Sequence, residues 1–214
     1  MGGRQRPVVS PPSSSAAAAV LPCLLTLLLL SLLPLPSLVS SNEEEDALLA
    51  LKRTFRDPGG TTASWTSGTG PCHGTVDGNS NTTSWPTIFC VNGHVTQFNM
   101  PYGVMAGSLV PELSNLKELK IMSLGNNNLS GAIPPELGDM TNLSDLDLNN
   151  NNLNGSIPSE LCKLPLTVLL LSNNSLSGEI PPCLMEIGKA FTYDGNPGLR
   201  RPPSQSSGSS STPP

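Results

Sequence analysis

A period of 24 residues constrains this chain more than any other feature. The segment Leu146 to Leu161, LDLNNNNLNGSIPSEL, matches the segment Met122 to Leu137, MSLGNNNLSGAIPPEL, after a shift of that length. A third copy follows 23 residues later, with one residue missing before Leu166, and a weaker copy occupies residues 95–113. Such a period is typical of solenoids, in which one repeat cannot bury its own apolar face and neighbours must stack.

The recurring letters each have a structural role. Leu146 and Leu148 alternate with a polar residue, which predicts a short strand with both leucines on one face. Asn151 follows where the chain turns, and its amide can bond backbone groups inside the stack. Gly155 permits the next bend, and Ile157–Pro158 favours an extended segment. We therefore predict an α/β repeat solenoid of about four repeats.

Composition divides the chain further. We predict a signal peptide (1–41), an N-terminal cap (42–94), the repeats (95–188), a degenerate C-terminal cap (189–203) and a disordered Ser/Pro tail (204–214). Residues 16–33 are almost wholly apolar, and Val39 and Ser41 fit a cleavage rule that places the mature start near Asn42. Because the apolar run approaches the length of a membrane span, an uncleaved anchor is the alternative.

The cap begins with a predicted helix. Leu48, Leu51 and Phe55 are spaced to share one helical face. Asn42 and Glu45 match a capping box, and the acidic residues around them suit the positive end of the helix dipole.

Four cysteines remain once Cys23 is assigned to the signal peptide, and in a secreted chain they favour disulfides. A bond between Cys72 and Cys90 would close a loop of fewer than twenty residues and contribute about 3 kcal/mol. We expect Trp65 and Trp85 to pack against this bond instead of forming a platform for sugars.

The combined motifs resemble a known family. The pattern LxxLxLxxNxLxGxIP resembles the plant-type leucine-rich repeat, and ALLALKRTFRDP followed by SW, PC and W-x4-C resembles the N-terminal cap of plant receptor-like kinases. The segment FTYDGNPGLRRPP is similar to their C-terminal cap, so the resemblance covers about residues 42–203. It implies a secreted or cell-surface protein-binding module, receptor-like or co-receptor-like in plant extracellular signalling.

Some positions depart from the family pattern. Arg200 stands where the C-terminal cap of the family has a cysteine, so the usual closing disulfide cannot form. Cys162 and Cys183 lie about one repeat apart but are offset by two positions, which leaves their pairing open. No kinase signature and no second apolar run of spanning length occur in the sequence, so we expect a free ectodomain or a shortened gene product.

The resemblance places a partner-binding surface on the strand side, where the residues between the leucines vary from repeat to repeat. The candidate residues are Gln97, Asn99, Tyr102, Lys120, Ser123, Asn126, Asp145, Asp147, Asn149, Val168 and Leu170. The third repeat is acidic there and the fourth is apolar, which favours a partner with a mixed basic and apolar surface. The expected partner is a receptor-kinase ectodomain or a secreted peptide or protein.

Other functions have less support. The net charge of −5 argues against nucleic acid as a partner. His73 and His94 show no metal-ligand spacing and no catalytic motif occurs, so we expect no enzyme activity, cofactor or metal. The alternatives are an inhibitor of a cell-wall-degrading enzyme such as polygalacturonase, and a truncated or structural wall protein. Glycosylation sequons occur at Asn81, Asn128, Asn142, Asn154 and Asn173.

Overall fold

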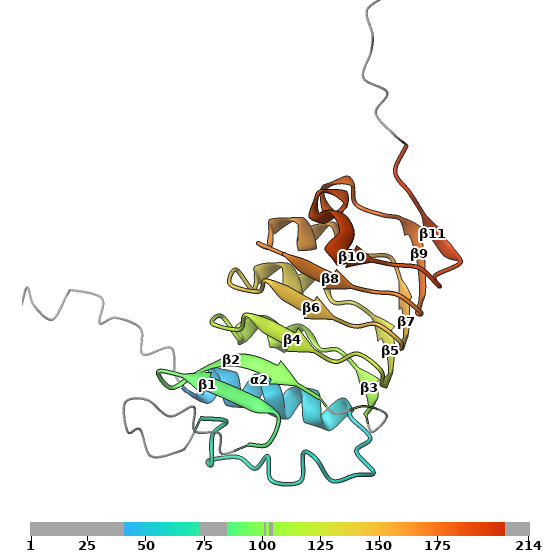
Figure 1. Cartoon of the computed structure of the whole chain (residues 1–214). Coiled ribbons are helices and arrows are strands. Elements are labelled where there is room, and N and C mark those ends of the chain that lie inside the picture. Colours follow the sequence, from blue (N-terminus) through green and yellow to red (C-terminus); the bar gives the residue numbers. More distant parts are fainter. Residues whose placement is uncertain (1–40, 73–84, 101, 103–104, 204–214) are drawn as a thin grey trace, which may run out of the picture. The chain divides into compact units, whose positions relative to one another are not determined.

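The repeats stack side by side as the 24-residue period predicts. The computed structural model describes residues 41–72, 85–100, 102 and 105–203, and the predicted signal peptide and Ser/Pro tail lie outside this part of the chain. Each repeat contributes one strand to each of two sheets, followed by a short 3₁₀-helix (Figure 1). A single longer α-helix, α2 (Ser41–Thr54), precedes the repeats in the described part of the chain.

The first sheet has six strands, and all of them except β1 run parallel to their neighbours. In spatial order these strands are β1 (Ile88–Val91), β2 (His94–Asn99), β4 (Ile121–Ser123), β6 (Asp145–Asp147), β8 (Val168–Leu170) and β10 (Phe191–Thr192). The second sheet has five: β11 (Gly198–Arg200), β9 (Ser175–Glu179), β7 (Asn152–Gly155), β5 (Asn128–Ala132) and β3 (Ala106–Ser108).

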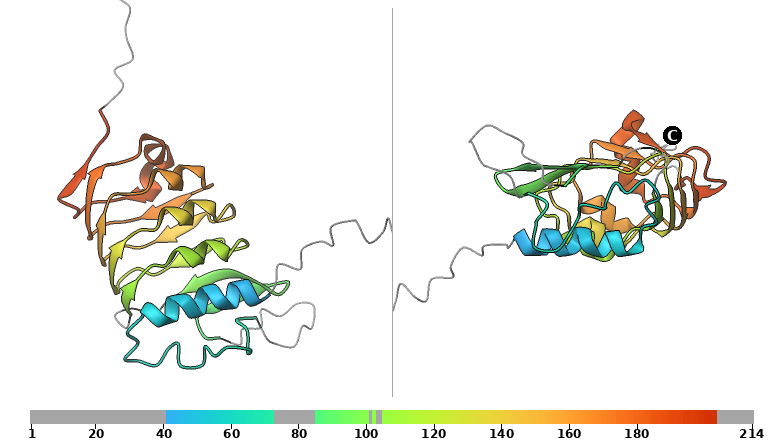
Figure 2. Two further views of the ribbon diagram at one scale, coloured as in Figure 1. Left: turned by 180° about the vertical axis from the view of Figure 1, so that it is seen from behind. Right: turned by 90° about the horizontal axis from the view of Figure 1, so that it is seen from below.

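The 3₁₀-helices lie on the side of the stack opposite the first sheet. They are η1 (Pro111–Asn115), η2 (Pro135–Asp139), η3 (Ser159–Lys163) and η4 (Pro182–Ala190). Figure 2 shows α2 on this same side, where it continues the row of helices at the N-terminal end of the stack. The cap helix therefore covers the core at the end where no further repeat precedes it.

The core is a ladder of apolar side chains in register. The central inward residues of successive strands pair with one another, and each is buried; they are Phe98, Met122, Leu146, Leu169 and Phe191. The step from Met122 to Leu146 is 24 residues (146 − 122), whereas the step from Leu146 to Leu169 is 23 (169 − 146). The predicted loss of one residue before Leu166 is thus confirmed.

A second ladder, of asparagine amides, runs through the interior. The Asn151 side-chain oxygen accepts the Leu129 N–H at 2.9 Å, and its nitrogen donates to the Leu124 and Leu148 carbonyl oxygens at 3.0 and 3.2 Å. Corresponding bonds are made by Asn127, Asn174 and Asn196. The predicted role is confirmed, and Asn196 extends the ladder into the segment that the sequence assigned only to the C-terminal cap. The backbone N–H and C=O groups that these amides bond are buried, so water cannot reach them. The asparagine side chains supply the hydrogen-bond partners that these groups need.

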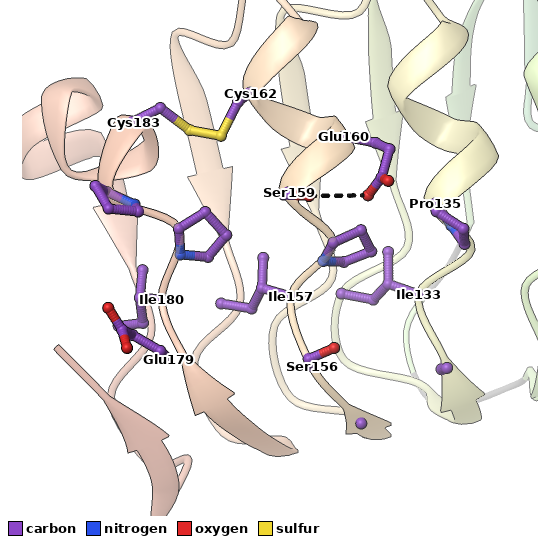
Figure 3. A pocket seen from close by; sticks show the side chains of 15 residues that line it. Ile133, Pro135, Ser156, Ile157, Ser159, Glu160, Cys162, Glu179, Ile180 and Cys183 are labelled. Atoms are coloured by element: carbon purple, nitrogen blue, oxygen red, sulfur yellow. Dashed lines mark hydrogen bonds between the residues drawn. A yellow bond between two sulfur atoms is a disulfide. The ribbon is translucent and has the colours of Figure 1, made fainter. Parts of the chain in front are cut away.

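The Ile–Pro segments lead from the second sheet into the 3₁₀-helices. Ile133, Ile157 and Ile180 occupy the same inward position in three successive repeats (Figure 3). The structure also joins Cys162 of η3 to Cys183 of η4, with 5.8 Å between their Cα atoms. The position just after the buried helical leucine of one repeat faces the position just before that leucine in the next, so the offset of two positions is the geometry that allows the bond.

The N-terminal cap is packed around its own disulfide. Cys72 and Cys90 are bonded, with 5.8 Å between their Cα atoms. The Trp65 and Trp85 rings stack with centroids 5.3 Å apart, and both side chains are only 1% exposed. Rings buried this deeply cannot stack on a sugar, so their role is packing.

Candidate protein-binding surface

The outward side of the first sheet presents two rows of side chains, which we call the strand face. The row nearer the start of each strand contains Gln97, Ile121, Asp145 and Val168, and the second row contains Asn99, Ser123, Asp147, Leu170 and Thr192. These residues alternate along each strand with the buried core residues, so they point away from the core. All of them are partly exposed.

The register corrects part of the predicted residue set. Lys120 lies just before β4, and the residue of that strand aligned with Asp145 is Ile121. Tyr102 lies beyond β2, where it is 79% exposed, and Asn126 lies in the turn after β4. Asn149 likewise follows β6, so these four candidates border the strand face. A shift of 24 residues from Asp145 would have found Ile121 in the sequence.

Two carboxylates form the centre of the strand face. Asp145 accepts hydrogen bonds from the Ser144 hydroxyl at 2.7 Å and the Thr167 hydroxyl at 3.5 Å. Asp147 accepts the Asn149 backbone N–H at 3.0 Å. Burial raises the pKa of the Asp147 carboxyl, although the hydrogen bond from Asn149 opposes this shift. Within the described part of the chain neither carboxylate has a cationic side chain within ion-pair distance.

A glycine makes room for this acidic centre. Gly125 is the counterpart of Asn149 one repeat earlier, and a Cβ atom added to it would lie 2.6 and 2.8 Å from the two carboxylate oxygens of Asp147. The same atom would also collide with the side-chain oxygen of Asn149. The side chains of Asp147 and Asn149 therefore lean into a notch that only glycine leaves open at this position.

Apolar side chains lie on both sides of the carboxylates. Ile121 precedes them, and Val168 and Leu170 follow them in the next strand. At the N-terminal end Phe89 pairs with Gln97 and points to the same side, 38% exposed, and Val91 is 48% exposed. Phe89 and Val91 were not among the predicted residues, although the disulfide of Cys90 fixes that residue inward and so turns its two neighbours outward.

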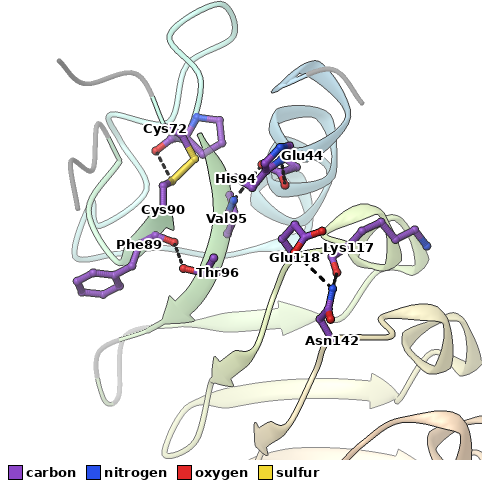
Figure 4. Close-up of polar contacts among 11 residues, drawn as sticks. Glu44, Cys72, Phe89, Cys90, His94, Val95, Thr96, Lys117, Glu118 and Asn142 are labelled. Atoms are coloured by element: carbon purple, nitrogen blue, oxygen red, sulfur yellow. Dashed lines mark hydrogen bonds and ion pairs between the residues drawn. A yellow bond between two sulfur atoms is a disulfide. The ribbon is translucent and has the colours of Figure 1, made fainter. Parts of the chain in front are cut away.

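A buried carboxylate joins the cap helix to the first sheet beside this surface. One oxygen of Glu44 accepts the Val95 backbone N–H at 3.1 Å, and the other lies 3.3 Å from His94 Nδ1 (Figure 4). Burial raises the pKa of Glu44 and nearby Glu118 raises it further, against the opposing effects of Val95 and His94. His94 is thus held in a structural contact with a carboxylate.

The acidic run of the cap helix also contacts the loop that follows the helix. Glu45, predicted to close a capping box with Asn42, is buried, and its carboxylate accepts the Gly68 backbone N–H from 23 residues further along the chain. The capping box itself stays a prediction.

The sequons lie outside the two rows of the strand face. Asn128 and Asn154 are on the second sheet, Asn142 precedes β6, and Asn173 lies in the turn after β8. Asn81, like His73, falls outside the described residues. Glycosylation stays a prediction, and a glycan on Asn173, which borders the strand face, would obstruct binding there.

The described residues offer neither a metal site nor a membrane-spanning helix. No group of three or more His, Cys, Asp or Glu side chains there is arranged to hold a metal ion. None of the helices in the described ranges is both long and apolar enough to cross a bilayer.

Comparisons with known proteins agree with this architecture. The "Leucine rich repeat N-terminal domain" family model matches residues 41–91, and the "Leucine Rich Repeat" model matches 118–140, 142–164 and 165–187. The chain is 38% identical over 102 residues to Protein MALE DISCOVERER 1 of Arabidopsis thaliana, a match that covers 46% of this chain and 13% of that protein. Overall, matches of this kind span 8–38% of the length of the curated relatives.

Solved structures give the same result. The crystal structure of PEPR1–AtPEP1 matches with a TM-score of 0.59 and 34% identity over 74% of this chain and 20% of that one. The HAESA ectodomain of Arabidopsis, in complex with an IDA peptide hormone, matches with a TM-score of 0.59 and 29% identity over 73% and 25%. Pollen Receptor Kinase 3 matches with a TM-score of 0.54 and 31% identity over 72% of this chain and 71% of that one.

The asparagine ladder, the parallel strand register, the disulfide-bearing cap and these matches lead to one conclusion: this chain belongs to the plant-type leucine-rich-repeat family and resembles the ectodomains of its receptor kinases.

Proposed function

We propose that this chain is an extracellular protein-binding module, receptor-like or co-receptor-like, that docks a partner on the strand face and has no catalytic role. One observation carries the proposal. Asp145 and Asp147 are partly buried without a cationic partner in the described structure, and apolar side chains flank them. A partner that presents a lysine or arginine between apolar residues would supply the missing charge and cover the apolar flanks.

The size of the strand face limits the kind of partner. The five strands that form it are separated by four steps of about 4.8 Å, so the face is only about 20 Å long. Such a surface suits a short peptide segment or the side of a larger ectodomain better than a long wrapped ligand. The Gly125 notch holds the Asp147 carboxylate at a single step of the stack, which favours a partner with one cationic side chain at the matching position.

The known relatives support protein partners in general. PEPR1 is found with AtPEP1 and HAESA with a peptide hormone, and both are ectodomains of the same repeat type. The predicted signal peptide over residues 1–41 and the sequons are consistent with export to the cell surface or apoplast.

The test compares the partners captured by the wild-type protein with those captured by a double variant of the strand face. We expect tagged wild-type protein, incubated with extracellular fluid of plant tissue, to retain a receptor-kinase ectodomain that mass spectrometry identifies. Leu170→Asp with Asp147→Lys should abolish that capture, because it removes the apolar flank and reverses the central charge. Ser177→Asp with Glu179→Lys is the matched control, since it makes the same net charge change on exposed positions of β9.

The outcomes separate the candidate functions. Capture that survives the strand-face variant but not the control would move the binding site to the second sheet. Recovery of a polygalacturonase in place of a receptor would favour the inhibitor alternative. Salt-extractable association with the wall, without a defined partner, would favour a structural wall protein.

A further inference from the structure

The bond between Cys162 and Cys183 lies where the stack is hollow. Cys162 is exposed and Cys183 is partly exposed. Both cysteines line a groove of about 760 Å³ on the side of the Ile–Pro segments (Figure 3). They also line a cavity of about 250 Å³ between η3 and η4, and Cys183 lines a third hollow of about 710 Å³ near residues 201–203. Solvent therefore reaches the bond from more than one side.

The interface between η2 and η3, one repeat earlier, is closed without a disulfide. The residues equivalent to Cys162 and Cys183 there are Gly138 and Glu160. There Gly138 of η2 faces Glu160 of η3, and a Cβ atom added to Gly138 would lie 2.5 Å from the Glu160 carbonyl oxygen. A side-chain position meets backbone closely in that interface, whereas a cavity of about 250 Å³ lies between η3 and η4.

The missing residue explains the hollow. After η2 the chain buries both Met140 and Leu143 completely before it enters β6. After η3, which is followed by one residue fewer, Leu164 remains 8% exposed, and Leu166 is only partly buried and lines the cavity. The apolar contact is weaker here because the shortened connection cannot carry its side chain as deep into the core.

The chain beyond η4 is attached through short strands. β10 pairs with β8 through two residues only, and the chain bends at Gly188, where φ is +71°. β11 adds three paired residues on the second sheet, and the buried Phe191 and Asn196 add an apolar and an amide contact. The covalent bond between η3 and η4 adds to these noncovalent links at the C-terminal end of the stack.

We propose that the Cys162–Cys183 disulfide is a reducible clip, and that its reduction by an extracellular dithiol or thiol selectively loosens the last repeat, residues 165–200. A thiolate of the reductant attacks the sulfur of Cys162, the more exposed of the two cysteines, and Cys183 leaves as a thiolate. The second thiol of the reductant then releases Cys162 and leaves as part of its own disulfide. Two electrons and two protons pass from the reductant to the protein.

The second disulfide of the chain serves as an internal reference. Cys90 is 5% exposed and lies in the core cluster with Trp65 and Trp85, and its partner Cys72 is partly exposed, so this bond offers a reductant one partly accessible side where the other bond has an exposed cysteine. Both bonds span Cα distances of 5.8 Å, so their different accessibility, and not their span, is what distinguishes them.

The experiment combines timed alkylation with hydrogen exchange on the full chain, using dithiothreitol as the reductant. We expect alkylation of Cys162 and Cys183 at least about tenfold faster than that of Cys72 and Cys90. In the partly reduced protein, amide exchange should rise about tenfold or more within residues 165–200 and stay unchanged within β4 and β6. Equal alkylation rates for both bonds, or unchanged exchange after reduction, would overturn the proposal.

A variant without the disulfide separates the effect of losing this bond from other effects of the reductant. Cys162→Ser with Cys183→Ser should show the exchange pattern of the reduced wild type and should not respond further to dithiothreitol. A variant that exchanges like the oxidised wild type contradicts the proposal. If the variant does not fold, the wild-type time course decides alone, because its cap disulfide stays closed during the measurement. Neither readout depends on a partner, so the result stands whether or not the strand face binds one.

Discussion

Two neighbouring interfaces of the stack are closed at the same pair of positions by different means. Between the second and third repeats, Gly138 lies so close to Glu160 that no side chain fits between them. Between the third and fourth repeats, Cys162 and Cys183 occupy these positions and form a covalent bond beside a cavity. The centre of the stack is thus held by close contact, and its C-terminal end by a disulfide.

The difference shows how a solenoid tolerates a change in repeat length. Each repeat contacts only its neighbours, so the effect of a missing residue stays at one interface. The strand register beyond the deletion is restored within one repeat, because Leu146 and Leu169 still pair. The defect remains as incomplete burial of Leu166, and the disulfide offsets it at the same place.

The largest expected effect comes from Asn151→Ala at the centre. This change leaves the Leu129 N–H buried without its partner, and it removes one of the two side-chain amides that bond the Leu124 and Leu148 carbonyls. An unsatisfied buried group costs about 1–3 kcal/mol and each lost hydrogen bond about 1 kcal/mol, so we expect the free energy of unfolding to fall by about 3 kcal/mol in urea titrations. A loss below 1 kcal/mol would mean that water replaces the amide.

The matched variant at the C-terminal end is Asn196→Ala. Its amide serves the Leu176 N–H and the Leu171 and Tyr193 carbonyls, but only the last repeat depends on them. We expect faster hydrogen exchange confined to the C-terminal side of Leu171, with the centre protected. Global destabilisation equal to that of Asn151→Ala would show that the C-terminal repeat is as tightly coupled to the stack as the central repeats are. This result would contradict the proposed difference between the two regions.

The next largest effect is expected from Gly138→Ala, which tests the close contact between η2 and η3. Gly138→Ala places a methyl group against the Glu160 backbone and should force η2 and η3 apart. We expect a loss of about 1–3 kcal/mol in unfolding free energy, the usual cost of overpacking. Ser114→Ala, at the same position of η1, is the control and should change stability by less than about 0.5 kcal/mol. A neutral Gly138→Ala would mean that the central interface has room to spare.

The 24-residue period predicted the main features of the stack that are compared here. The repeat spacing identified the missing residue, and the strand register places it where the alignment did. The role of Asn151 also followed from sequence, because a polar residue at a fixed place in an apolar stack needs buried backbone partners. The pairing of Cys162 with Cys183 did not follow, since a linear alignment does not reveal which positions of neighbouring 3₁₀-helices face each other.

Features that depend on contacts outside the period were missed. Glu44 and Glu45 look like ordinary first-turn acids, and nothing in the local sequence points to the Val95 and Gly68 N–H groups that they bind. Ile121 was passed over in favour of Lys120, because the start of a three-residue strand cannot be fixed within one residue by pattern alone. The family resemblance gave the fold; it did not give these contacts.

The N-terminal end is linked to the stack in a third way, through the buried carboxyl group of Glu44. The pKa of Glu44 is raised in the folded state above its ordinary value of 4.5, so the folded protein binds more protons than the unfolded chain as the pH rises through this window. Stability should therefore fall as pH rises from about 4.5 through the raised pKa of Glu44. Glu44→Gln should flatten this slope, and Glu43→Gln, an exposed neighbour on the same helix, should preserve it. An identical slope in both variants would assign the pH dependence to other groups.

The smallest effect on stability is expected on the strand face, for Asp147→Asn. The new amide oxygen can still accept the Asn149 N–H, and the variant no longer carries a charge that burial disfavours. Since the raised pKa means that the charged form of Asp147 is unfavourable in the fold, we expect stability at neutral pH to stay within about 0.5 kcal/mol of the wild type or to rise slightly. Asp145→Asn is the matched control one row away, where the Ser144 and Thr167 hydroxyls bond the carboxylate. A loss above 1 kcal/mol in Asp147→Asn would show that the fold itself uses this charge. A neutral result leaves the charge without a structural role and therefore available to a cationic partner, as the proposed binding surface requires.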